Sequence, residues 1–227
     1  MEIAERHRGI VALLPQLVRW GETSGRSFPW RSERGFRLAV AEVLLQKTRG
    51  AAVEQVWGSL LEAYPDARAL AAARRSELER IVGPLGLGRQ RASRLIAMAQ
   101  FFCESTTDDR RGLGAYGEGV VRLADGRLPE VAPVDGNVAR VLSRVYGWKF
   151  ERGEPRKKPE VRDAVLSILA TPGSENRLSI FYALVDLGAE LCRPKRPRCA
   201  SCPFAGVCWY ALGDTTVAAE VRSEARK

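Results

Sequence analysis

Four of the five cysteines in this chain lie within 17 residues, and their spacing is the strongest chemical signal in the sequence. The spacing C-x6-C-x2-C-x5-C joins Cys192, Cys199, Cys202 and Cys208, whereas Cys103 stands apart. Four closely spaced thiols of this kind predict a metal site. Four thiolates can hold either a tetrahedral zinc ion or an iron–sulfur cluster. The single C-x2-C pair favours a 4Fe–4S cluster, because zinc sites usually contain two such pairs.

Positive charge accompanies the cysteines. The chain has 36 Lys and Arg against 27 Asp and Glu, a net charge of +9, which indicates a polyanionic partner such as nucleic acid. Within the cysteine loop the cations are Arg193, Lys195, Arg196 and Arg198. If a metal orders the loop, we expect these side chains to contact phosphates. The alternative is a solvated basic turn.

The rest of the sequence is patterned for helices. Apolar residues at helical spacing occur in residues 10–18, 37–48, 51–64, 76–82, 89–103, 137–147, 160–170 and 176–190. Alternating β-branched runs are absent, so the pattern predicts an all-α fold, with breaks at Gly and Pro clusters including the Gly-rich residues 112–119. No apolar stretch is long enough to cross a membrane, and the N-terminus is charged. We therefore expect no membrane association and a cytoplasmic location, at the nucleoid if the source is bacterial.

Several short motifs, in order, resemble the endonuclease III superfamily of helix-hairpin-helix DNA glycosylases. The cysteine spacing is that of the family's iron–sulfur loop. The other matching motifs are FPWR at 28–31, AEVLLQKT at 41–48, LGL at 85–87 with RA at 91–92, VDGNV at 134–138 with RVL at 140–142, and DLGA at 186–189. Each motif is weak alone, but their order together with the cysteine spacing makes the resemblance specific over residues 26–210.

The resemblance implies a two-lobed all-α fold. One lobe is a helical barrel with the helix-hairpin-helix, at residues 31–133. The other joins residues 1–30 to 134–212 and carries the 4Fe–4S cluster loop, which leaves 213–227 as a tail. The implied partner is double-stranded DNA with a mismatched or damaged base, which is flipped into the cleft between the lobes. We expect the protein to act as a monomer.

Four residues take catalytic positions of the family. Asp135 matches the carboxylate that stabilises the sugar cation and activates water, although an Asp here can equally cap a helix. Asn137 matches a residue that buttresses the site by hydrogen bonding. Glu42 stands in an apolar run, so desolvation should raise its pKa and let it protonate the departing base, unless it faces solvent. Tyr116 occupies the position of the Schiff-base lysine in lyase-active members, which implies a monofunctional enzyme that uses water.

Other residues match DNA-binding positions. Gln46 and Lys47 belong to the turn that fills the gap left by a flipped base. Gly112 and Gly114 align with hairpin glycines whose backbone N–H groups hold a phosphate. However, the usual Leu-Pro before these glycines is replaced by Arg-Arg, and the hairpin's first helix is short. Arg91 is expected either to contact a phosphate or to lie on a solvated helix face.

We expect excision of thymine or uracil opposite guanine, and two alternatives remain, a second substrate and a non-enzymatic function. The GLGRQRA segment at 86–92 and Lys47 favour excision of thymine or uracil opposite guanine. Glu42, Gln46 and the DGNV string favour adenine opposite guanine or 8-oxoguanine, but the domain that reads 8-oxoguanine does not follow Cys208 in this sequence. The altered hairpin also fits a DNA-binding iron–sulfur protein whose catalysis is changed or lost.

Overall fold

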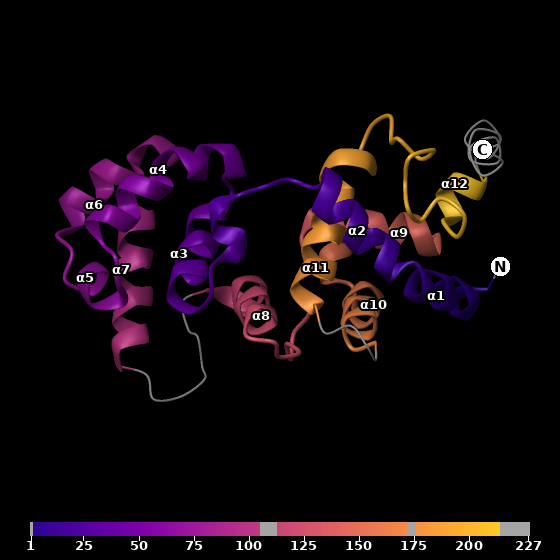
Figure 1. Cartoon of the computed structure of the whole chain (residues 1–227), viewed down its shortest axis with the longest axis horizontal. Coiled ribbons are helices and arrows are strands. Elements are labelled where there is room, and N and C mark those ends of the chain that lie inside the picture. The colour runs from indigo at the N-terminus through magenta and orange to yellow at the C-terminus, as the bar shows by residue number, and fades with distance from the viewer. Residues whose placement is uncertain (1, 105–112, 172–175, 214–227) are drawn as a thin grey trace. The chain divides into compact units, whose positions relative to one another are not determined.

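The computed structural model describes residues 2–104, 113–171 and 176–213 (Figure 1). Every regular element within these residues is a helix, which confirms the all-α prediction. The chain packs as two compact units. Unit 1 combines residues 1–26 with 130–227, and unit 2 comprises residues 27–129. No helix in the described part of the chain is long and apolar enough to cross a membrane.

Unit 2 is built around one helix that is apolar on all sides. In chain order its elements are η1 (Pro29–Ser32), α3 (Gly35–Leu45), α4 (Gly50–Ala63), α5 (Ala67–Ala71), α6 (Arg75–Val82), η2 (Gly83–Leu85), α7 (Gly88–Glu104) and α8 (Gly114–Ala124). In α3 every residue from Leu38 to Leu44 is buried. A helix that is apolar all round must be surrounded by protein, and α3 packs against η1, α4, α7 and α8.

Aromatic packing explains the FPWR motif. The Phe28 ring stacks on the Trp30 ring with centroids 4.8 Å apart. Trp30 is buried and meets the edge of the Trp57 ring at 5.6 Å. Offset and edge contacts of this kind are the favourable geometries for aromatic rings. The motif therefore fixes the start of unit 2 against α4.

Helix α8 differs from the sequence prediction, which placed a break in the Gly-rich residues 112–119. The helix instead begins at Gly114 and includes Gly117 and Gly119, both buried. A Cβ on Gly117 would lie 3.3 Å from the Glu42 Cβ of α3. Glycine is therefore used here for close helix packing rather than for chain reversal.

Unit 1 supplies the remaining helices. They are α1 (Ile3–Ala12), α2 (Leu14–Ser24), α9 (Gly136–Tyr146), η3 (Pro155–Lys157), α10 (Pro159–Leu169), α11 (Arg177–Asp186), the π-helical turn η4 (Leu187–Leu191) and α12 (Trp209–Gly213). The predicted stripe at residues 10–18 spans two helices, because Pro15 begins a new helix in the first turn of α2. The π-helical turn η4 ends directly before Cys192, the first cysteine of the array. The cysteine loop therefore begins where the regular α-helical hydrogen bonding of α11 has already changed.

The single histidine of the chain ties three helices of unit 1 together. His7 Nδ1 lies 2.7 Å from the Tyr146 hydroxyl, and His7 Nε2 lies 3.0 Å from the Ser167 hydroxyl. Burial raises the pKa of Tyr146 to about 12, so its hydroxyl stays protonated near neutral pH. The histidine thus links α1 to α9 and α10, which is a structural role.

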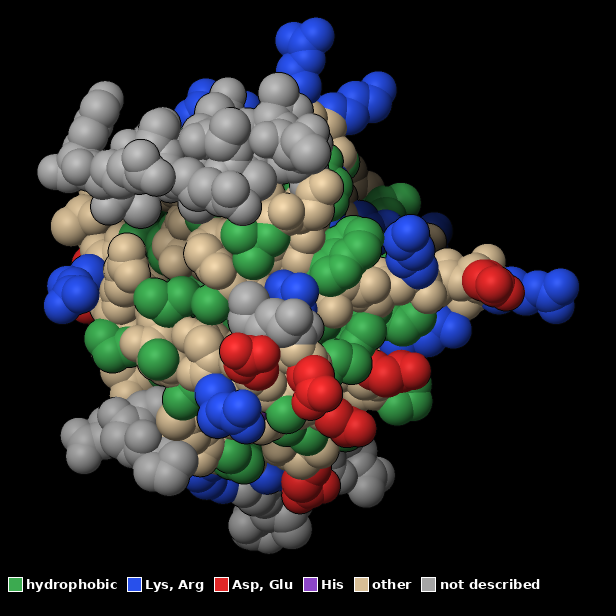
Figure 2. Space-filling model, turned by 90° about the vertical axis from the view of Figure 1, so that its right-hand side faces the viewer, with side chains coloured by type: hydrophobic (Ala, Val, Ile, Leu, Met, Phe, Trp, Pro, Cys, Tyr) green, Lys and Arg blue, Asp and Glu red, His purple; other side chains and the backbone are tan. Residues whose placement is uncertain are grey.

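Figure 2 looks onto the end of unit 1 that carries α1 and α12. Asp and Glu side chains gather over one part of this face, while Lys and Arg side chains project mainly from its edges. Hydrophobic side chains lie between them. Both signs of charge therefore share this face, and the net positive charge of the chain does not form a uniform basic surface there.

Candidate functional site

Helix α9 begins with a carboxylate that is anchored at both oxygens. Asp135 Oδ1 accepts a hydrogen bond from the Val138 backbone N–H at 2.7 Å, which makes it the N-cap of α9. Asp135 Oδ2 accepts from Asn137 Nδ2 at 3.1 Å. Burial nevertheless raises the pKa of Asp135, because desolvation outweighs these stabilising hydrogen bonds. The group is therefore a cap and also a carboxylate whose ionisation is disfavoured by its surroundings.

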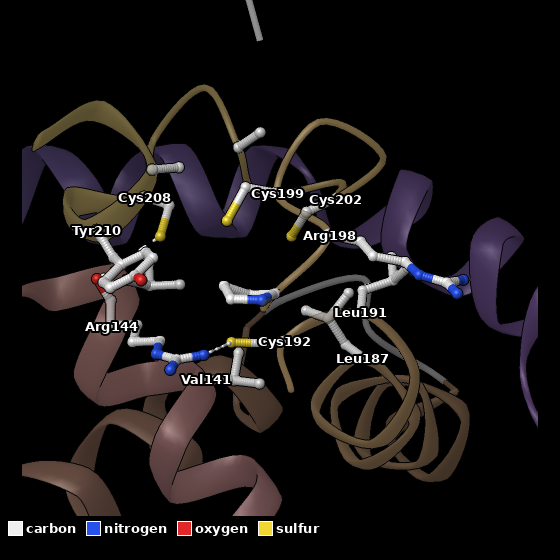
Figure 3. Close-up of a pocket in the computed structure, with 14 residues that line it drawn as sticks. Val141, Arg144, Leu187, Leu191, Cys192, Arg198, Cys199, Cys202, Cys208 and Tyr210 are labelled. Atoms are coloured by element: carbon white, nitrogen blue, oxygen red, sulfur yellow. Dashed lines mark hydrogen bonds between the residues drawn. The ribbon is translucent and has the colours of Figure 1, made fainter. Parts of the chain in front are cut away.

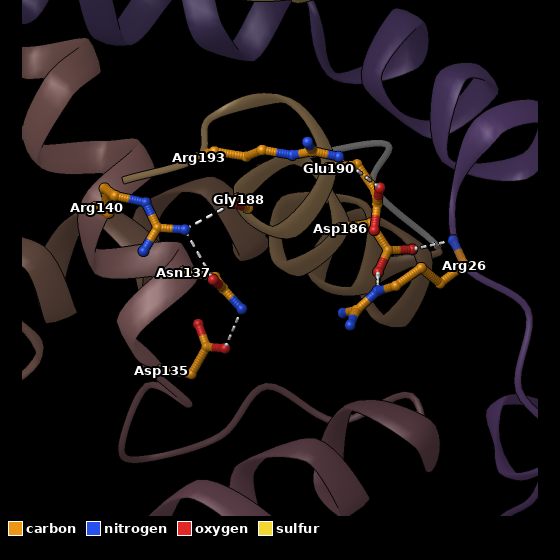
Figure 4. Close-up of polar contacts among 8 residues, drawn as sticks. All are labelled: Arg26, Asp135, Asn137, Arg140, Asp186, Gly188, Glu190 and Arg193. Carbon is orange, nitrogen blue, oxygen red and sulfur yellow. Dashed lines mark hydrogen bonds and ion pairs between the residues drawn. The ribbon is translucent and has the colours of Figure 1, made fainter. Parts of the chain in front are cut away.

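A chain of hydrogen bonds fixes the Asn137 amide (Figure 4). Arg140 Nη2 donates to Asn137 Oδ1 at 2.8 Å and to the Gly188 carbonyl at 2.7 Å. Arg140 Nε donates to the Cys192 carbonyl at 2.7 Å. Because the Asn137 oxygen is held by a cation, its NH2 group must face Asp135. These hydrogen bonds connect the Asp135 carboxylate at the start of α9, through Asn137 and Arg140, to the first cysteine of the array.

The four cysteines of the array line one pocket in unit 1. Figure 3 shows their sulfur atoms pointing into this common space: Cys199, Cys202 and Cys208 from one side and Cys192 from the other. Burial raises the pKa of Cys202 to about 12, and burial also raises that of Cys208. Without a metal these two thiols would stay protonated at neutral pH, and metal binding would displace their protons.

Two kinds of metal group could be held by four thiols, and they need different spacings between the sulfur atoms. Among the described residues, no group of three or more His, Cys, Asp or Glu side chains is arranged to hold a metal ion. A zinc ion with Zn–S bonds of about 2.3 Å would draw four sulfurs into contact around one point. A four-iron cluster is larger, so its four thiolates stand farther apart around a wider space. The residues that line the pocket include the four thiols and no His, Asp or Glu side chain, so the available ligands are the thiolates that both groups accept.

The predicted cations of the cysteine loop differ in exposure. Lys195, Arg196 and Arg198 are exposed, whereas Arg193 is partly buried and lies 3.6 Å from Glu190 in an ion pair. Arg196 also has a positive φ of 50°. Three of the four loop cations are therefore available at the surface of unit 1.

In unit 2, Glu42 is buried in the middle of α3, with 6% of its surface exposed. The alternative of a solvent-facing Glu42 is therefore wrong. Tyr116 lies on α8, directly before the glycine that packs against Glu42, and is partly buried. The helices α3 and α8 thus hold two of the predicted catalytic side chains within the same unit.

The turn after α3 forms a second hollow in unit 2. Gln46 Oε1 accepts a hydrogen bond from Arg94 Nη1 at 2.7 Å. Lys47 has a positive φ of 56°, a backbone conformation that residues other than glycine rarely adopt. Both residues line the hollow together with Leu87 and Gln90.

A comparison with protein families identifies the chain. Residues 40–164 match the model of the HhH-GPD superfamily base excision DNA repair proteins. The chain belongs to this superfamily. The matched range includes Glu42, Gln46 and Lys47 of unit 2 and the Asp135–Asn137–Arg140 chain of unit 1.

Individual HhH-GPD relatives have different substrates in their names. A thymine-DNA glycosylase of Aeropyrum pernix is 31% identical over 218 residues, which cover 90% of this chain and 96% of the relative. An adenine DNA glycosylase of Mycolicibacterium smegmatis is 30% identical over 87% of this chain and 69% of its own length. The solved structure of a thermostable thymine-DNA glycosylase superposes with a TM-score of 0.76 at 23% identity, covering 91% of this chain and 97% of the other. That structural match supports the predicted helix-hairpin-helix glycosylase fold.

Arg91 of this HhH-GPD chain does not lie where the sequence pattern predicted, at a phosphate or on a solvated helix face. It is only 5% exposed, so it neither lies on a solvated face nor presents its charge to a phosphate. Its Nη1 donates to the Leu44 carbonyl at 2.8 Å and to the Val43 carbonyl at 3.1 Å, and its Nη2 donates to the Thr48 hydroxyl at 2.8 Å. Arg91 therefore caps the C-terminal end of α3, where carbonyls lack helical partners.

Replacing Arg91 by Met should destabilise the protein. The substitution keeps the length of the side chain but leaves the α3 carbonyls buried without donors, which we expect to lower the free energy of unfolding by about 2–3 kcal/mol. Urea unfolding followed by circular dichroism would measure it. Arg89→Met is the control, because Arg89 is exposed on the same helix. Equal stability of the two variants would contradict the capping role.

Leu87 is a candidate functional residue that the sequence pattern did not indicate. It is 59% exposed and has a positive φ of 54°, beside the equally strained Lys47 in the same hollow. Strained residues with exposed apolar side chains cluster at functional sites. The signal in the sequence was a leucine between two glycines, Gly86 and Gly88.

The hairpin is described only in part. Gly112 and the predicted short first helix fall on residues 105–112, which lie outside the described residues. Gly114 is described, begins α8 and has a positive φ of 70°, which suits a glycine. Phosphate binding at these glycines stays a prediction.

Proposed function

We propose that this HhH-GPD protein is a monofunctional DNA glycosylase that excises thymine or uracil opposite guanine. The observation that carries the proposal is Asp135, a carboxylate with a raised pKa that Asn137 and the α9 backbone hold in place. The choice of thymine or uracil is supported by the thymine-DNA glycosylase relative, because its alignment with this chain covers 96% of the relative's length. The substrate is double-stranded DNA, and we propose that the protein acts on it as a monomer.

Each catalytic side chain has a separate task in this proposal. Cleavage of an N-glycosidic bond leaves positive charge on the sugar and negative charge on the base. Ionised Asp135 would stabilise the sugar cation and orient water, and Asn137 would keep that carboxylate in position. Buried Glu42, in its protonated form, would donate a proton to the departing base.

DNA binding is assigned to residues at the surface of both units. In unit 2 these are the exposed Lys47 and Leu87, which have a strained backbone, and the partly buried Gln46 beside them. Their side chains would meet a duplex that has lost a stacked base. In unit 1 they are Lys195, Arg196 and Arg198, which would contact phosphates. We propose that unit 2 corresponds to the helical-barrel domain and unit 1 to the iron–sulfur domain.

A panel of labelled duplexes tests the substrate. The duplexes carry T/G, U/G, A/G, A opposite 8-oxoguanine and a reduced pyrimidine, and each is incubated with the protein and then heated in alkali. We expect strand breaks at T/G and U/G. Breaks only at adenine would replace the proposal by its alternative, which buried Glu42 and the adenine DNA glycosylase relative favour. Tight binding without breaks on any duplex would instead indicate a DNA-binding protein without glycosylase activity.

Tyr116 makes the reaction product testable. A phenol cannot form a Schiff base with the sugar, so the abasic strand should stay intact until alkali is added. Borohydride added during the reaction should therefore trap no covalent protein–DNA adduct, which gel electrophoresis would reveal. A trapped adduct would show that another amine attacks the sugar.

The four cysteines of the array are proposed to hold a 4Fe–4S cluster. When bound, the cluster would cross-link the loop between Cys192 and Cys208 and so order its exposed cations. Replacing Cys202 by Ser should remove most of the iron and sulfide from the purified protein and weaken DNA binding. Cys103→Ser is the matched control, because Cys103 is exposed and lies outside the array. Equal iron content in the two variants, or one equivalent of zinc in the wild type, would contradict the cluster.

A further inference from the structure

One arginine of α9 reaches both ends of the cysteine array. Arg144 Nη1 lies 3.4 Å from Cys192 Sγ, the first cysteine. The Arg144 backbone carbonyl lies 3.6 Å from Cys208 Sγ, the last cysteine. Figure 3 shows its guanidinium beside Cys192 at the edge of the pocket. Arg144 is thus a helical residue outside the loop that contacts its first and last thiols.

The guanidinium also holds the backbone and a ring of the same loop. Its Nη1 donates to the Arg193 carbonyl at 2.7 Å and its Nη2 to the Pro194 carbonyl at 2.9 Å. Its central carbon lies 4.8 Å from the centroid of the Tyr210 ring. A planar fork with several donors can bind two carbonyls and stack on an aromatic ring at once, whereas an ammonium cannot. These contacts join the segment after Cys192 to the segment after Cys208.

The charge of Arg144 would act on an electron-rich group. A cluster held by four thiolates gains negative charge when it is reduced. A cation and an N–H donor beside one of its sulfurs favour the more negative state and so raise the reduction potential. Arg140 and Arg6 also lie near the array, but they donate to backbone carbonyls there, those of Cys192 and Val207. Arg144 differs from them because its donor reaches a sulfur.

We propose that Arg144 is a positioning residue that closes the cysteine loop around the bound cluster and raises the reduction potential of that cluster. The inference rests on the proposed 4Fe–4S cluster. It assigns two separable tasks to one side chain: the donor fork closes the loop, and the positive charge sets the potential.

Three variants separate these tasks. Arg144→Gln removes the charge and most of the donor fork, and Arg144→Lys keeps the charge without the fork. Arg198→Gln is the control. Like Arg144→Gln it removes one positive charge near the array, but the Arg198 side chain points away from the sulfur atoms (Figure 3). All four proteins are reconstituted anaerobically with iron and sulfide. The readouts are iron per chain, the rate at which a chelator removes iron, and the reduction potential.

We expect Arg144→Gln to release iron roughly tenfold faster or more, which is the usual size of an outer-shell effect on a metal site. Its potential should be more negative than that of the wild type. Arg144→Lys should release iron faster as well, but its potential should stay close to the wild-type value. Arg198→Gln should match the wild type in both measurements.

Two results would overturn the inference in different ways. A wild-type protein that takes up no iron would refute the cluster itself, and the inference with it. If the wild type binds the cluster but both Arg144 variants match Arg198→Gln in release rate and potential, the cluster stands and the role of Arg144 is wrong. Circular dichroism of each variant shows whether a loss of iron reflects a loss of fold.

Discussion

Replacing Asp135 by Asn is expected to slow base excision by about a thousandfold or more while DNA binding persists. The amide cannot supply negative charge to the sugar cation or accept a proton from water. It still caps α9, because Asn is as good an N-cap as Asp. Single-turnover rates at saturating protein would measure the effect, and gel-shift titration would measure binding. Excision at the wild-type rate would remove Asp135 from the catalytic role.

The same substitution should also change how the stability of the protein depends on pH. Burial raises the pKa of Asp135, so the native state binds its proton more tightly than the unfolded chain does. For a carboxyl of this kind, the free energy of unfolding falls as pH rises from about 4 through the native pKa. The amide of the variant carries no charge at any of these pH values and avoids this loss. Relative to the wild type, the variant should therefore gain stability as pH rises from about 4 through the native pKa. A pH-independent cost remains, because its NH2 group faces the Asn137 NH2 group.

A second cap provides the control for Asp135→Asn. Asp66 caps α5 by accepting from the Ala69 backbone N–H at 2.8 Å, but it lies exposed at the surface of unit 2. Asp66→Asn should leave excision unchanged, because Asp66 caps a helix of unit 2 and is not one of the proposed catalytic residues. For the wild type, excision should decline on acidification at a higher pH than an ordinary Asp would give, because only the ionised carboxylate stabilises the cation. Slowed excision in both variants would indicate that the loss of a helix cap, rather than the loss of the Asp135 carboxylate, slows the reaction.

The residues that could be predicted from sequence are those whose chemistry is local. The N-cap at Asp135 follows from its place before a helix start, whereas the hydrogen-bonding role of Asn137 came from the family resemblance. The cysteine array is local in the same sense, because its four members lie within 17 residues, and its thiols line a single pocket. The buried position of Glu42 followed from the apolar residues on both sides of it.

The residues that could not be predicted depend on partners far away in the sequence. Arg91 was taken for a surface cation because its acceptors lie 43–48 positions earlier, at the end of α3. Gly117 was counted as a helix breaker because its reason, the approach of α3, is tertiary. Arg144 follows Arg140 by one helical turn, so their shared face was visible in the sequence. The carbonyls and the sulfur that they bind lie about 50 residues further on.

A second large effect is expected from Asp186, which the sequence shows only as part of the DLGA motif. Asp186 is fully buried at the end of α11. Its Oδ2 accepts from the Arg26 backbone N–H at 2.9 Å, and its Oδ1 from Arg26 Nε at 2.7 Å (Figure 4). A Cβ on the preceding Gly25 would lie 2.8 Å from Asp186 Oδ2, so the chain passes directly over the carboxylate. Arg26 is the last residue of unit 1 before the chain continues into unit 2.

Asp186→Asn should lower the free energy of unfolding by about 3 kcal/mol, because an NH2 group replaces one acceptor that faces a buried donor. Urea unfolding would measure this loss. Arg26→Gln should cost less, since the Arg26 side chain is 32% exposed and the backbone N–H still reaches the carboxylate. The double variant should then cost less than the sum of the two single changes, because both remove the same interaction. Strict additivity would mean that Asp186 is buried for packing alone. The predicted coupling instead makes this carboxylate the anchor for the point at which the chain leaves unit 1, so cleavage by protease near residues 26–28 should accelerate in Asp186→Asn.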